Sequence, residues 1–457
     1  MRSIEMIIVE VEKIIVYFEG ENIVELEDPM CDPLKPRKIQ FSDISAAAFN
    51  IRKAVLMTPC TVRYLILSIS RLFKRSHQLS KLLKTEIYFK KEFLQVTGSF
   101  KERGARNALI KLTKEEKING VIAASAGNHA LALCYHGEIL NIPVTVVMPV
   151  TAPLMKITLC RSFGANIVLD GENLSKAKAT AMKLAKENNL KYINGYDHPD
   201  IIAGQGTIGL EVLEQVENVD AIIVPTGGGG LISGIALAVK TLNPHITVVG
   251  VEAETCPSFK RSLEAGTIIE TKAASTLADG LAVPLIGGNA MATAQGFIDQ
   301  MVTVTEKNTA LAILRLLEME KAVVEGAGAV GLAAFIEHKL PQLVGKRVVI
   351  ILSGGNIDTT VLGRTIERGL AADSRLVHFD VLISDRPGGI AELATLLSHQ
   401  GVSIKDIFHE RAWISKDVFS VRIRAIVETR DNDHAHLLES ALKERYKDVN
   451  FSDFIEI

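Results

Sequence analysis

Residues Lys91 to Leu109 read K-E-F-L-Q-V-T-G-S-F-K-E-R-G-A-R-N-A-L, with Lys101 near the middle. Thr97, Gly98 and Ser99 form a polar, permissive turn that can cap a helix, and the helix formers after it carry Lys101 near that helix's first turn. Unpaired backbone N–H groups and the positive end of the helix dipole both disfavour a charged lysine there. The pattern fits a lysine that forms an imine, although an ordinary solvated helix lysine would give the same local sequence.

The composition favours a soluble protein of two or three domains with a small-molecule site. Its 457 residues, 47% of them hydrophobic, can bury a large core. With 51 Lys and Arg against 53 Asp and Glu, the formal net charge is −2, so no basic field recruits nucleic acid or an anionic membrane. Charges interrupt the apolar runs before the roughly 18 residues that a spanning helix needs, so no membrane span is expected.

The cysteines and the N-terminal residues indicate a cytoplasmic protein. Residues 1–32 are rich in acidic residues, which is the wrong charge for a mitochondrial transit peptide, and their apolar segment is too interrupted for a secretory signal. We expect residues 1–40 to be an N-terminal extension, in which residues 1–32 form a short hairpin. Five scattered cysteines without C-x-x-C spacing argue against a disulfide framework or zinc cluster: Cys31, Cys60, Cys134, Cys160 and Cys256.

Short β-branched runs alternate with helical segments along the middle of the chain. The runs are 121–124, 144–148, 167–169, 221–224, 247–251 and 348–352, and the helical segments include 174–187, 207–215 and 231–241. This alternation predicts an α/β fold with mostly parallel sheets, covered on both faces. Ligand sites in such folds lie at the carboxyl ends of the strands, so the turns after these strands should carry the function.

Three of those turns carry residues that can bind a ligand or take part in a reaction. Ser125 and Asn128 follow the first run, and Ser353 follows the last. The turn after the run 221–224 contains a tetraglycine, made of Gly227, Gly228, Gly229 and Gly230. Four residues without Cβ let several N–H groups point at one anion, although a tetraglycine can also be only a close-packing turn. An imine-forming lysine, a phosphate cradle and hydrogen-bonding side chains together describe a site for pyridoxal 5'-phosphate.

Six motifs follow one another within residues 41–373. They are E-x-x-Q-x-T-G-S-F-K-x-R-G-A from Glu92, S-A-G-N-H-A from Ser125, A-G-Q-G-T-I from Ala203, the tetraglycine, T-L-A-D-G from Thr276 and S-G-G-N from Ser353. Together they resemble the threonine and serine dehydratases of the fold-type II pyridoxal phosphate enzymes, a family shared with serine racemase. The resemblance implies a two-lobed catalytic domain over residues 41–373, similar to the tryptophan synthase β fold.

The resemblance assigns the cofactor contacts residue by residue. It makes Lys101 the Schiff-base lysine and general base, with Phe100 flanking the ring. Asn128 bonds the phenolic oxygen, the tetraglycine holds the phosphate, and Ser353 faces the pyridine nitrogen. Because a neutral serine cannot keep that nitrogen protonated as a carboxylate would, elimination of a β-substituent is favoured over long-lived carbanion chemistry.

The substrate contacts follow from the same resemblance. Ser125 and the N–H groups of the turn after it would bind the substrate carboxylate, and Asn128 and Glu325 would also line the pocket. Glu325 can equally be a first-turn helix carboxylate without a function. His129 is expected to be a structural or capping histidine rather than a base.

The chain departs from the family pattern at several positions. Glu252 matches a cation ligand of some relatives, but Ser258 stands where their second carboxylate would align, so no metal is expected. Leu131 replaces the glutamine usual after S-A-G-N-H-A. Val62–Arg75 looks like an insertion, either a surface excursion or a gene-model artefact, and by itself it has the pattern of an amphipathic surface helix.

Residues 374–457 form a separate unit with a different pattern. Strands are predicted at 378–383, 402–411, 418–427 and near 451–455, with helices at 390–400 and 434–446, which gives a ferredoxin-like βαββαβ order. D-R-P-G-G-I-A-E-L-A and the later G-V-S-I resemble an ACT domain, an amino-acid-sensing module, although a dimerisation domain without ligand is the alternative. The implied effector site comprises Asp385, Pro387, Gly388, Gly389 and Ile390, at an interface between subunits.

The resemblance implies an ammonia-lyase that converts L-threonine to 2-oxobutanoate and ammonia, and L-serine to pyruvate and ammonia. Lys101 would remove the Cα proton, and the β-hydroxyl would leave as water with help from the cofactor phosphate. The first alternative, a serine racemase, needs a second acid/base opposite Lys101, where this chain has Ala126. A catalytically silent amino-acid sensor is the second alternative. We expect an allosteric homodimer or homotetramer, with isoleucine and then valine as candidate effectors.

Overall fold

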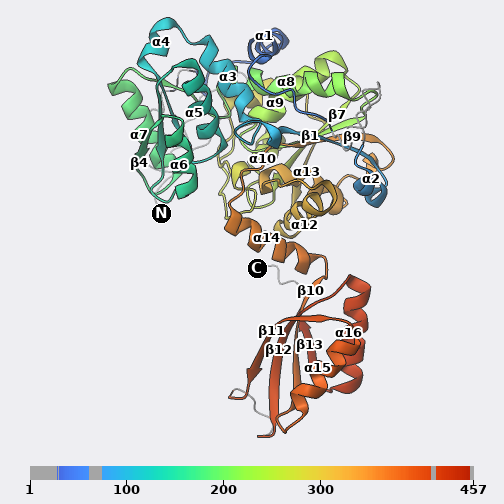
Figure 1. Cartoon of the computed structure of the whole chain (residues 1–457). Helices are drawn as coiled ribbons and strands as arrows, with labels where there is room; N and C mark the ends of the chain where they lie inside the picture. The colour runs from blue at the N-terminus through green and yellow to red at the C-terminus, as the bar shows by residue number, and fades with distance from the viewer. Residues whose placement is uncertain (1–27, 29, 61–74, 413–417, 453–457) are drawn as a thin grey trace, which may run out of the picture. The chain divides into compact units, whose positions relative to one another are not determined.

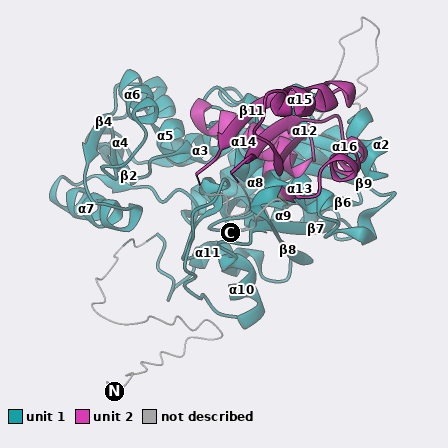
Figure 2. Ribbon diagram, turned by 90° about the horizontal axis from the view of Figure 1, so that it is seen from below, with its two compact units in different colours: residues 1–309, 316–357 teal, residues 310–315, 358–457 magenta. Residues whose placement is uncertain are grey.

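A computed structural model of the chain describes residues 28, 30–60, 75–412 and 418–452 (Figure 1). The chain forms two compact units, which are drawn in different colours in Figure 2. Unit 1 comprises Met1–Thr309 and Leu316–Ile357, and unit 2 comprises Ala310–Arg315 and Asp358–Ile457. Residues 1–27 and 29, which make up nearly all of the expected N-terminal hairpin, lie outside the described residues, as do residues 62–74 of the expected insertion. Within the described part of the chain, no helix is long and apolar enough to cross a membrane.

The smaller sheet of unit 1 has four parallel strands in the order β4-β3-β2-β5. Helices α3, α5 and α6 pack against one face through a shared apolar core, and α7 packs against the other through its alanines. The strands are β2 (Val121–Ala124), β3 (Val144–Met148), β4 (Asn166–Leu169) and β5 (Lys191–Tyr192). The helices are α3 (Lys101–Lys111), α4 (Lys114–Asn119), α5 (Asn128–Leu140), α6 (Leu154–Ser162) and α7 (Leu174–Glu187).

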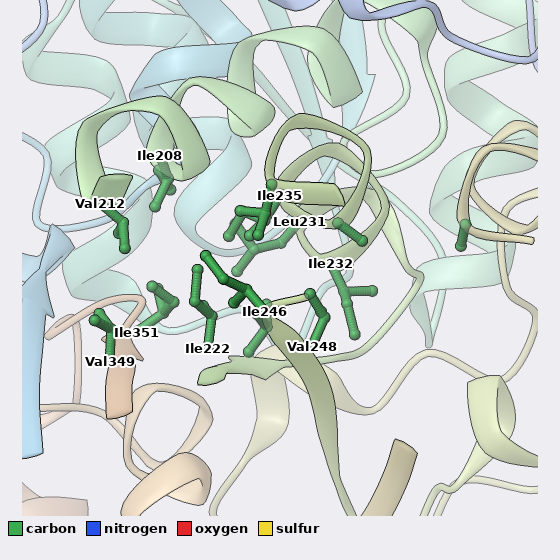
Figure 3. Close-up of a cluster of buried hydrophobic side chains, with 14 of the residues drawn as sticks. Ile208, Val212, Ile222, Leu231, Ile232, Ile235, Ile246, Val248, Val349 and Ile351 are labelled. Carbon is green, nitrogen blue, oxygen red and sulfur yellow. The ribbon is translucent and has the colours of Figure 1, made fainter. Parts of the chain in front are cut away.

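The larger sheet of unit 1 has five parallel strands in the order β1-β9-β6-β7-β8. Its strands are β1 (Glu86–Lys91), β6 (Ala221–Pro225), β7 (Thr247–Ala253), β8 (Gln300–Val304) and β9 (Arg347–Leu352). Helices α8 (Pro199–Gln215) and α9 (Gly230–Leu242) pack on one face, where Ile208 and Ile235 approach Ile222 of β6 (Figure 3). Helix α13 (Gly326–Ile336) contacts β6, β7, β8 and β9. Every residue of β6 is buried, which explains its continuous apolar sequence.

The remaining helices and turns belong to unit 1, except for α14 and the last six residues of α12, which belong to unit 2. They are α1 (Phe41–Ile51), α2 (His77–Leu83), η1 (Glu92–Leu94), α10 (Ser258–Ala265), η2 (Asp279–Leu281), α11 (Gly288–Ala294), α12 (Glu306–Arg315), the π-helical turn η3 (Leu316–Glu320), η4 (Pro341–Leu343) and α14 (Thr359–Ala372). The predicted α/β fold with mostly parallel sheets is therefore confirmed for unit 1.

Unit 2 is built on one antiparallel sheet of four strands in the order β11-β12-β10-β13. Its elements are β10 (Leu376–Ser384), α15 (Gly389–His399), β11 (Ser403–Glu410), β12 (Ser420–Glu428), α16 (Asn432–Arg445) and β13 (Val449–Ser452). Both helices bury leucines against β10 and β12, so they share one apolar core with the sheet. The predicted βαββαβ order is confirmed, although the last strand begins at Val449, earlier than expected.

Candidate active site

Lys101 is the first residue of α3 and is partly buried. Its Nζ donates a hydrogen bond to the carbonyl oxygen of Gly195 at 2.5 Å. Burial lowers the pKa of Lys101 to about 8, and the negative charge of Glu325 opposes this shift only in part. This environment differs from that of a solvated helix lysine, and it leaves a fraction of the amine neutral near neutral pH.

The helix that carries Lys101 is anchored by a buried ion cluster. Arg103 is fully buried, and its Nη2 donates to Oε1 of Glu92 at 2.7 Å while its Nη1 donates to Oε1 of Glu211 at 2.6 Å. Lys90 also pairs with Glu211, at 2.5 Å. Burial alone would raise the pKa of Glu92, but the charge and hydrogen bonds of Arg103 hold it below its ordinary value. Glu92 and Arg103, the first and twelfth residues of the motif that begins at Glu92, therefore fix α3 in place.

Asn128 connects the two sheets of unit 1. It is the first residue of α5, after β2, and its Nδ2 donates to Oε1 of Glu325 at 2.7 Å. Asn356, after β9, donates from Nδ2 to Oδ1 of Asn128 at 2.8 Å and to the carbonyl oxygen of Thr97 at 2.7 Å. Since an amide nitrogen carries two N–H groups, Asn128 keeps one donor without an acceptor among the described residues.

Glu325 stands immediately before α13 and is 6% exposed. Burial raises the pKa of its carboxyl group to about 7, the charge of Asp279 acts in the same direction, and the hydrogen bond from Asn128 opposes both. A carboxyl group with this pKa exchanges its proton near neutral pH. This shift makes Glu325 a candidate for a functional role, which stays a prediction.

The tetraglycine Gly227–Gly230 follows β6 and leads into α9. Gly229 has a φ of +97°, in the left-handed region, and a Cβ there would come within 2.1 Å of the Phe259 ring. A Cβ on Gly228 would come within 2.4 Å of the Tyr196 ring. Close packing alone thus excludes side chains from this turn.

The same turn is suited to an anion. Among the described residues, the N–H groups of Gly227, Gly228 and Gly229 donate to no other backbone oxygen. These N–H groups stand directly before the 13-residue helix α9, whose dipole favours negative charge at its start. The close-packing and the phosphate-binding interpretations of the tetraglycine are therefore compatible.

Ser353 and Phe100 are joined by a backbone hydrogen bond. The N–H of Phe100 donates to the carbonyl oxygen of Ser353 at 3.0 Å, and Ser99 forms a β-bridge with Gly354. Ser353 is 2% exposed, and Nζ of Lys101 lies 5.1 Å from the centre of the Phe100 ring. The end of β9 is thus joined directly to the lysine turn.

Ser125 and His129 belong to the turn after β2 and to the start of α5. Oγ of Ser125 accepts a hydrogen bond from the N–H of Gly127 at 3.3 Å. Nε2 of His129 bonds the carbonyl oxygen of Ile193 at 2.9 Å. Burial, and then the charge of Lys101, lowers the pKa of His129 to about 3, so it stays neutral, and its structural role stays a prediction.

Glu252 is engaged by a neighbouring helix. Its Oε1 and Oε2 accept hydrogen bonds from the N–H groups of Phe259 and Lys260 at 2.8 and 2.9 Å, at the start of α10. Ser258 donates from Oγ to the carbonyl oxygen of Val283 at 2.7 Å. Glu252 therefore satisfies the N-terminal N–H groups of a helix, and the absence of a metal there stays a prediction.

Two site residues received no role from the sequence. Gly195 accepts the Lys101 bond, and a Cβ on it would come within 2.8 Å of the His129 ring. Asn356 closes the network around Asn128. Asn356 was visible as the last letter of S-G-G-N, whereas Gly195 follows the two-residue strand β5, which is too short to leave a periodic pattern.

Comparisons with known proteins agree with this geometry. Residues 72–354 match the model of the family described as pyridoxal-phosphate dependent enzyme. The chain is 42% identical over 367 residues to the L-threonine ammonia-lyase of Thermotoga maritima, covering 80% of this chain and 91% of that protein. It is 38% identical over 334 residues to the catabolic L-threonine dehydratase TdcB of Staphylococcus aureus strain N315, covering 73% and 93%.

Solved structures give the same result. The processed form of threonine deaminase isoform 2 from Solanum lycopersicum has a TM-score of 0.66 and 34% identity, covering 73% of this chain and 95% of that one. Serine racemase from Dictyostelium discoideum has a TM-score of 0.63 and 35% identity, covering 70% and 99%.

Proposed function

The chain belongs to the pyridoxal-phosphate dependent enzymes, and on that premise we propose that it is an ammonia-lyase acting on L-threonine, with L-serine as a second substrate. The products are 2-oxobutanoate or pyruvate, with ammonia. The observation that carries the proposal is the amine of Lys101, whose pKa is lowered to about 8. Lys101 directly follows a turn that bonds Ser353 and Asn356, and Asn356 in turn bonds Asn128. Relatives named for threonine support the substrate, since the chain spans 91% of one of them at 42% identity.

The residues present fit the cofactor. The N–H groups of Gly227, Gly228 and Gly229, which donate to no backbone oxygen of the described residues, suit its phosphate at the start of α9. The second amide N–H of Asn128 suits its phenolic oxygen. Ser353 would face the ring nitrogen and Phe100 would flank the ring. When bound, pyridoxal phosphate withdraws electrons from the Cα of the amino acid joined to it.

The residues of this chain perform the remaining tasks. Lys101 holds and moves the Cα proton at Nζ, and its pKa of about 8 keeps both protonation states populated near neutral pH. The polar turn that begins with Ser125 takes the substrate carboxylate. Glu325, linked to Asn128, contributes a carboxyl group whose pKa of about 7 lets it exchange protons at the edge of the site.

The racemase alternative is disfavoured by one side chain. Removal and return of a proton on opposite faces of Cα requires a second acid/base opposite Lys101. Ala126 occupies the position where the family resemblance places a serine for this task, and a methyl group cannot carry a proton. D-serine should therefore form far more slowly than pyruvate.

Regulation by unit 2 is the finer part of the proposal. Gly388 has a φ of +100° and precedes α15, so backbone N–H groups at this helix start can take an amino-acid carboxylate. Next to them, Asp385 accepts a 2.7 Å bond from Arg411, while Pro387 and Gly389 shape the turn and Ile390 is 46% exposed. We assign the effector site to these residues, with isoleucine and then valine as effectors.

The open edge of unit 2 supports a homodimer or homotetramer. Strand β11 lies at the edge of its sheet, and Ile407 and Phe408 on it are 44% and 56% exposed. An edge strand with exposed apolar side chains is commonly completed by a second copy. We also place the enzyme in the cytoplasm, on the basis of its free cysteines.

Purified protein tests the activity directly. We expect 2-oxobutanoate and ammonia in equal amounts from L-threonine, together with an absorbance band from the lysine-bound cofactor. Lys101→Ala should remove the band and lower kcat by at least about 10⁴-fold, because both nucleophilic and acid/base functions are lost. Full activity in Lys101→Ala would contradict the proposal.

Deletion of residues 374–457 tests the regulatory part. An effector must bind two enzyme states unequally, so isoleucine should shift the apparent threonine affinity of the full chain by about 5-fold or more. The shortened enzyme should keep kcat and ignore isoleucine and valine. If the full chain is equally indifferent to every amino acid tested, unit 2 has no regulatory role.

A further inference from the structure

Two fully buried titratable side chains lie next to the lysine site without belonging to it. Oε2 of Glu102 on α3 lies 3.4 Å from Nε2 of His136 on α5, and both side chains are 0% exposed. Glu102 directly follows Lys101, and His136 lies two turns after Asn128. Burying two such groups costs free energy unless contacts with other protein groups compensate for the lost water.

Glu102 holds the turn that precedes Lys101. Its Oε1 accepts a hydrogen bond from the N–H of Thr97, while the carbonyl oxygen of Thr97 accepts the 2.7 Å bond from Asn356. Asn356 uses the same amide group to bond Oδ1 of Asn128 at 2.8 Å. A continuous chain of contacts thus runs from His136 through Glu102, Thr97 and Asn356 to Asn128.

Two hydroxyl groups of this turn make no competing hydrogen bond with a described residue. The hydroxyl groups of Thr97 and Ser99 are buried without a hydrogen-bond partner among the described residues. Within that part of the chain, Oε2 of Glu102 and both ring nitrogens of His136 also lack hydrogen-bond partners. The imidazole lies 3.4 Å from Oε2, while Oε1 faces the N–H of Thr97.

We propose that Glu102 and His136 are positioning residues, which hold Thr97 so that Asn356 presents the Asn128 amide to the ring oxygen of the cofactor. This inference rests on the proposed function. It predicts that the two residues affect the electronic state of the bound cofactor and kcat, and leave the affinity for the substrate carboxylate nearly unchanged.

The test compares Glu102→Ala, Glu102→Gln and His136→Ala in the holoenzyme. Glu102→Ala should shift the absorbance maximum of the bound cofactor and lower kcat about tenfold, the effect of one buried hydrogen bond, with KM for L-threonine within about twofold. Glu102→Gln keeps an oxygen acceptor for Thr97, so it should restore most of both. His136→Ala should shift the band in the same direction by less, and the double variant should match Glu102→Ala.

The matched control is Glu138→Ala, an exposed carboxylate on the same helix as His136, which should behave like the parent. A parental band position and kcat in Glu102→Ala would overturn the inference, as would a loss that Glu102→Gln fails to restore. If Glu102→Ala does not fold, an unchanged band and kcat in His136→Ala overturn it equally. A parent without the band or without ammonia release would instead show that the proposed function itself is wrong.

Discussion

Lys101 and Arg103 lie two residues apart at the start of α3, yet their charges are balanced in opposite ways. Although burial disfavours its charge, Arg103 is held between Glu92 and Glu211, which raise the pKa of its guanidinium above the ordinary value. Lys101 bonds a neutral carbonyl group, and burial lowers its pKa to about 8. One helix turn can thus hold both a charge that is paired with carboxylates and anchors the helix, and an amine that is bonded to a neutral group and can react.

Of the changes that test this difference, Arg103→Ala should have the largest effect on the free energy of unfolding. Glu92 is 0% exposed, so the variant would leave a buried carboxylate without its partner and lower the free energy of unfolding by about 3–5 kcal/mol. Urea unfolding of the parent and the variant measures the difference. Arg106→Ala, one turn further along α3, should cost under about 1 kcal/mol. Equal losses in the two variants would mean that the ion cluster does not anchor the helix.

A smaller effect should appear in the pH dependence of stability. Glu325 has a folded pKa of about 7 against an ordinary value of 4.5, so the folded chain binds more protons than the unfolded chain between these values. Its contribution to stability is therefore complete below pH 4.5 and is lost as the pH rises to 7. Glu325→Gln should remove this decline, which is on the order of 1–3 kcal/mol. Parallel unfolding curves for parent and variant from pH 4.5 to 7 would refute the assignment.

The sequence predicted the fold well where local pattern and packing agree. The ranges of β2, β3 and α7 match the predicted segments, because β-branched runs and evenly spaced alanines reflect local preferences directly. Helix α8 begins at Pro199, eight residues before the predicted start at Thr207. Its first half contains Gly204 and Gly206, which have low helix propensity but let α8 approach the backbones of α3 and α9 closely.

The candidate site was predictable in its residues but not in its connections. Motif order identified Lys101 and Asn128, and the structure places both at helix starts. The bond between Asn128 and Glu325 spans 197 positions of sequence, so no local pattern reports it. The pKa shifts of Lys101 and Glu325 arise from burial by segments distant in sequence, which is a property of the folded chain alone.

The central claim is that burial keeps the amine of Lys101 partly neutral near neutral pH. A pH titration of the cofactor-free protein by nitrogen-15 NMR of its lysine side chains tests this most directly, with Lys101→Arg identifying the signal. The account predicts a midpoint at about 8 for Lys101. A midpoint near the ordinary lysine value of about 10.4 would contradict it.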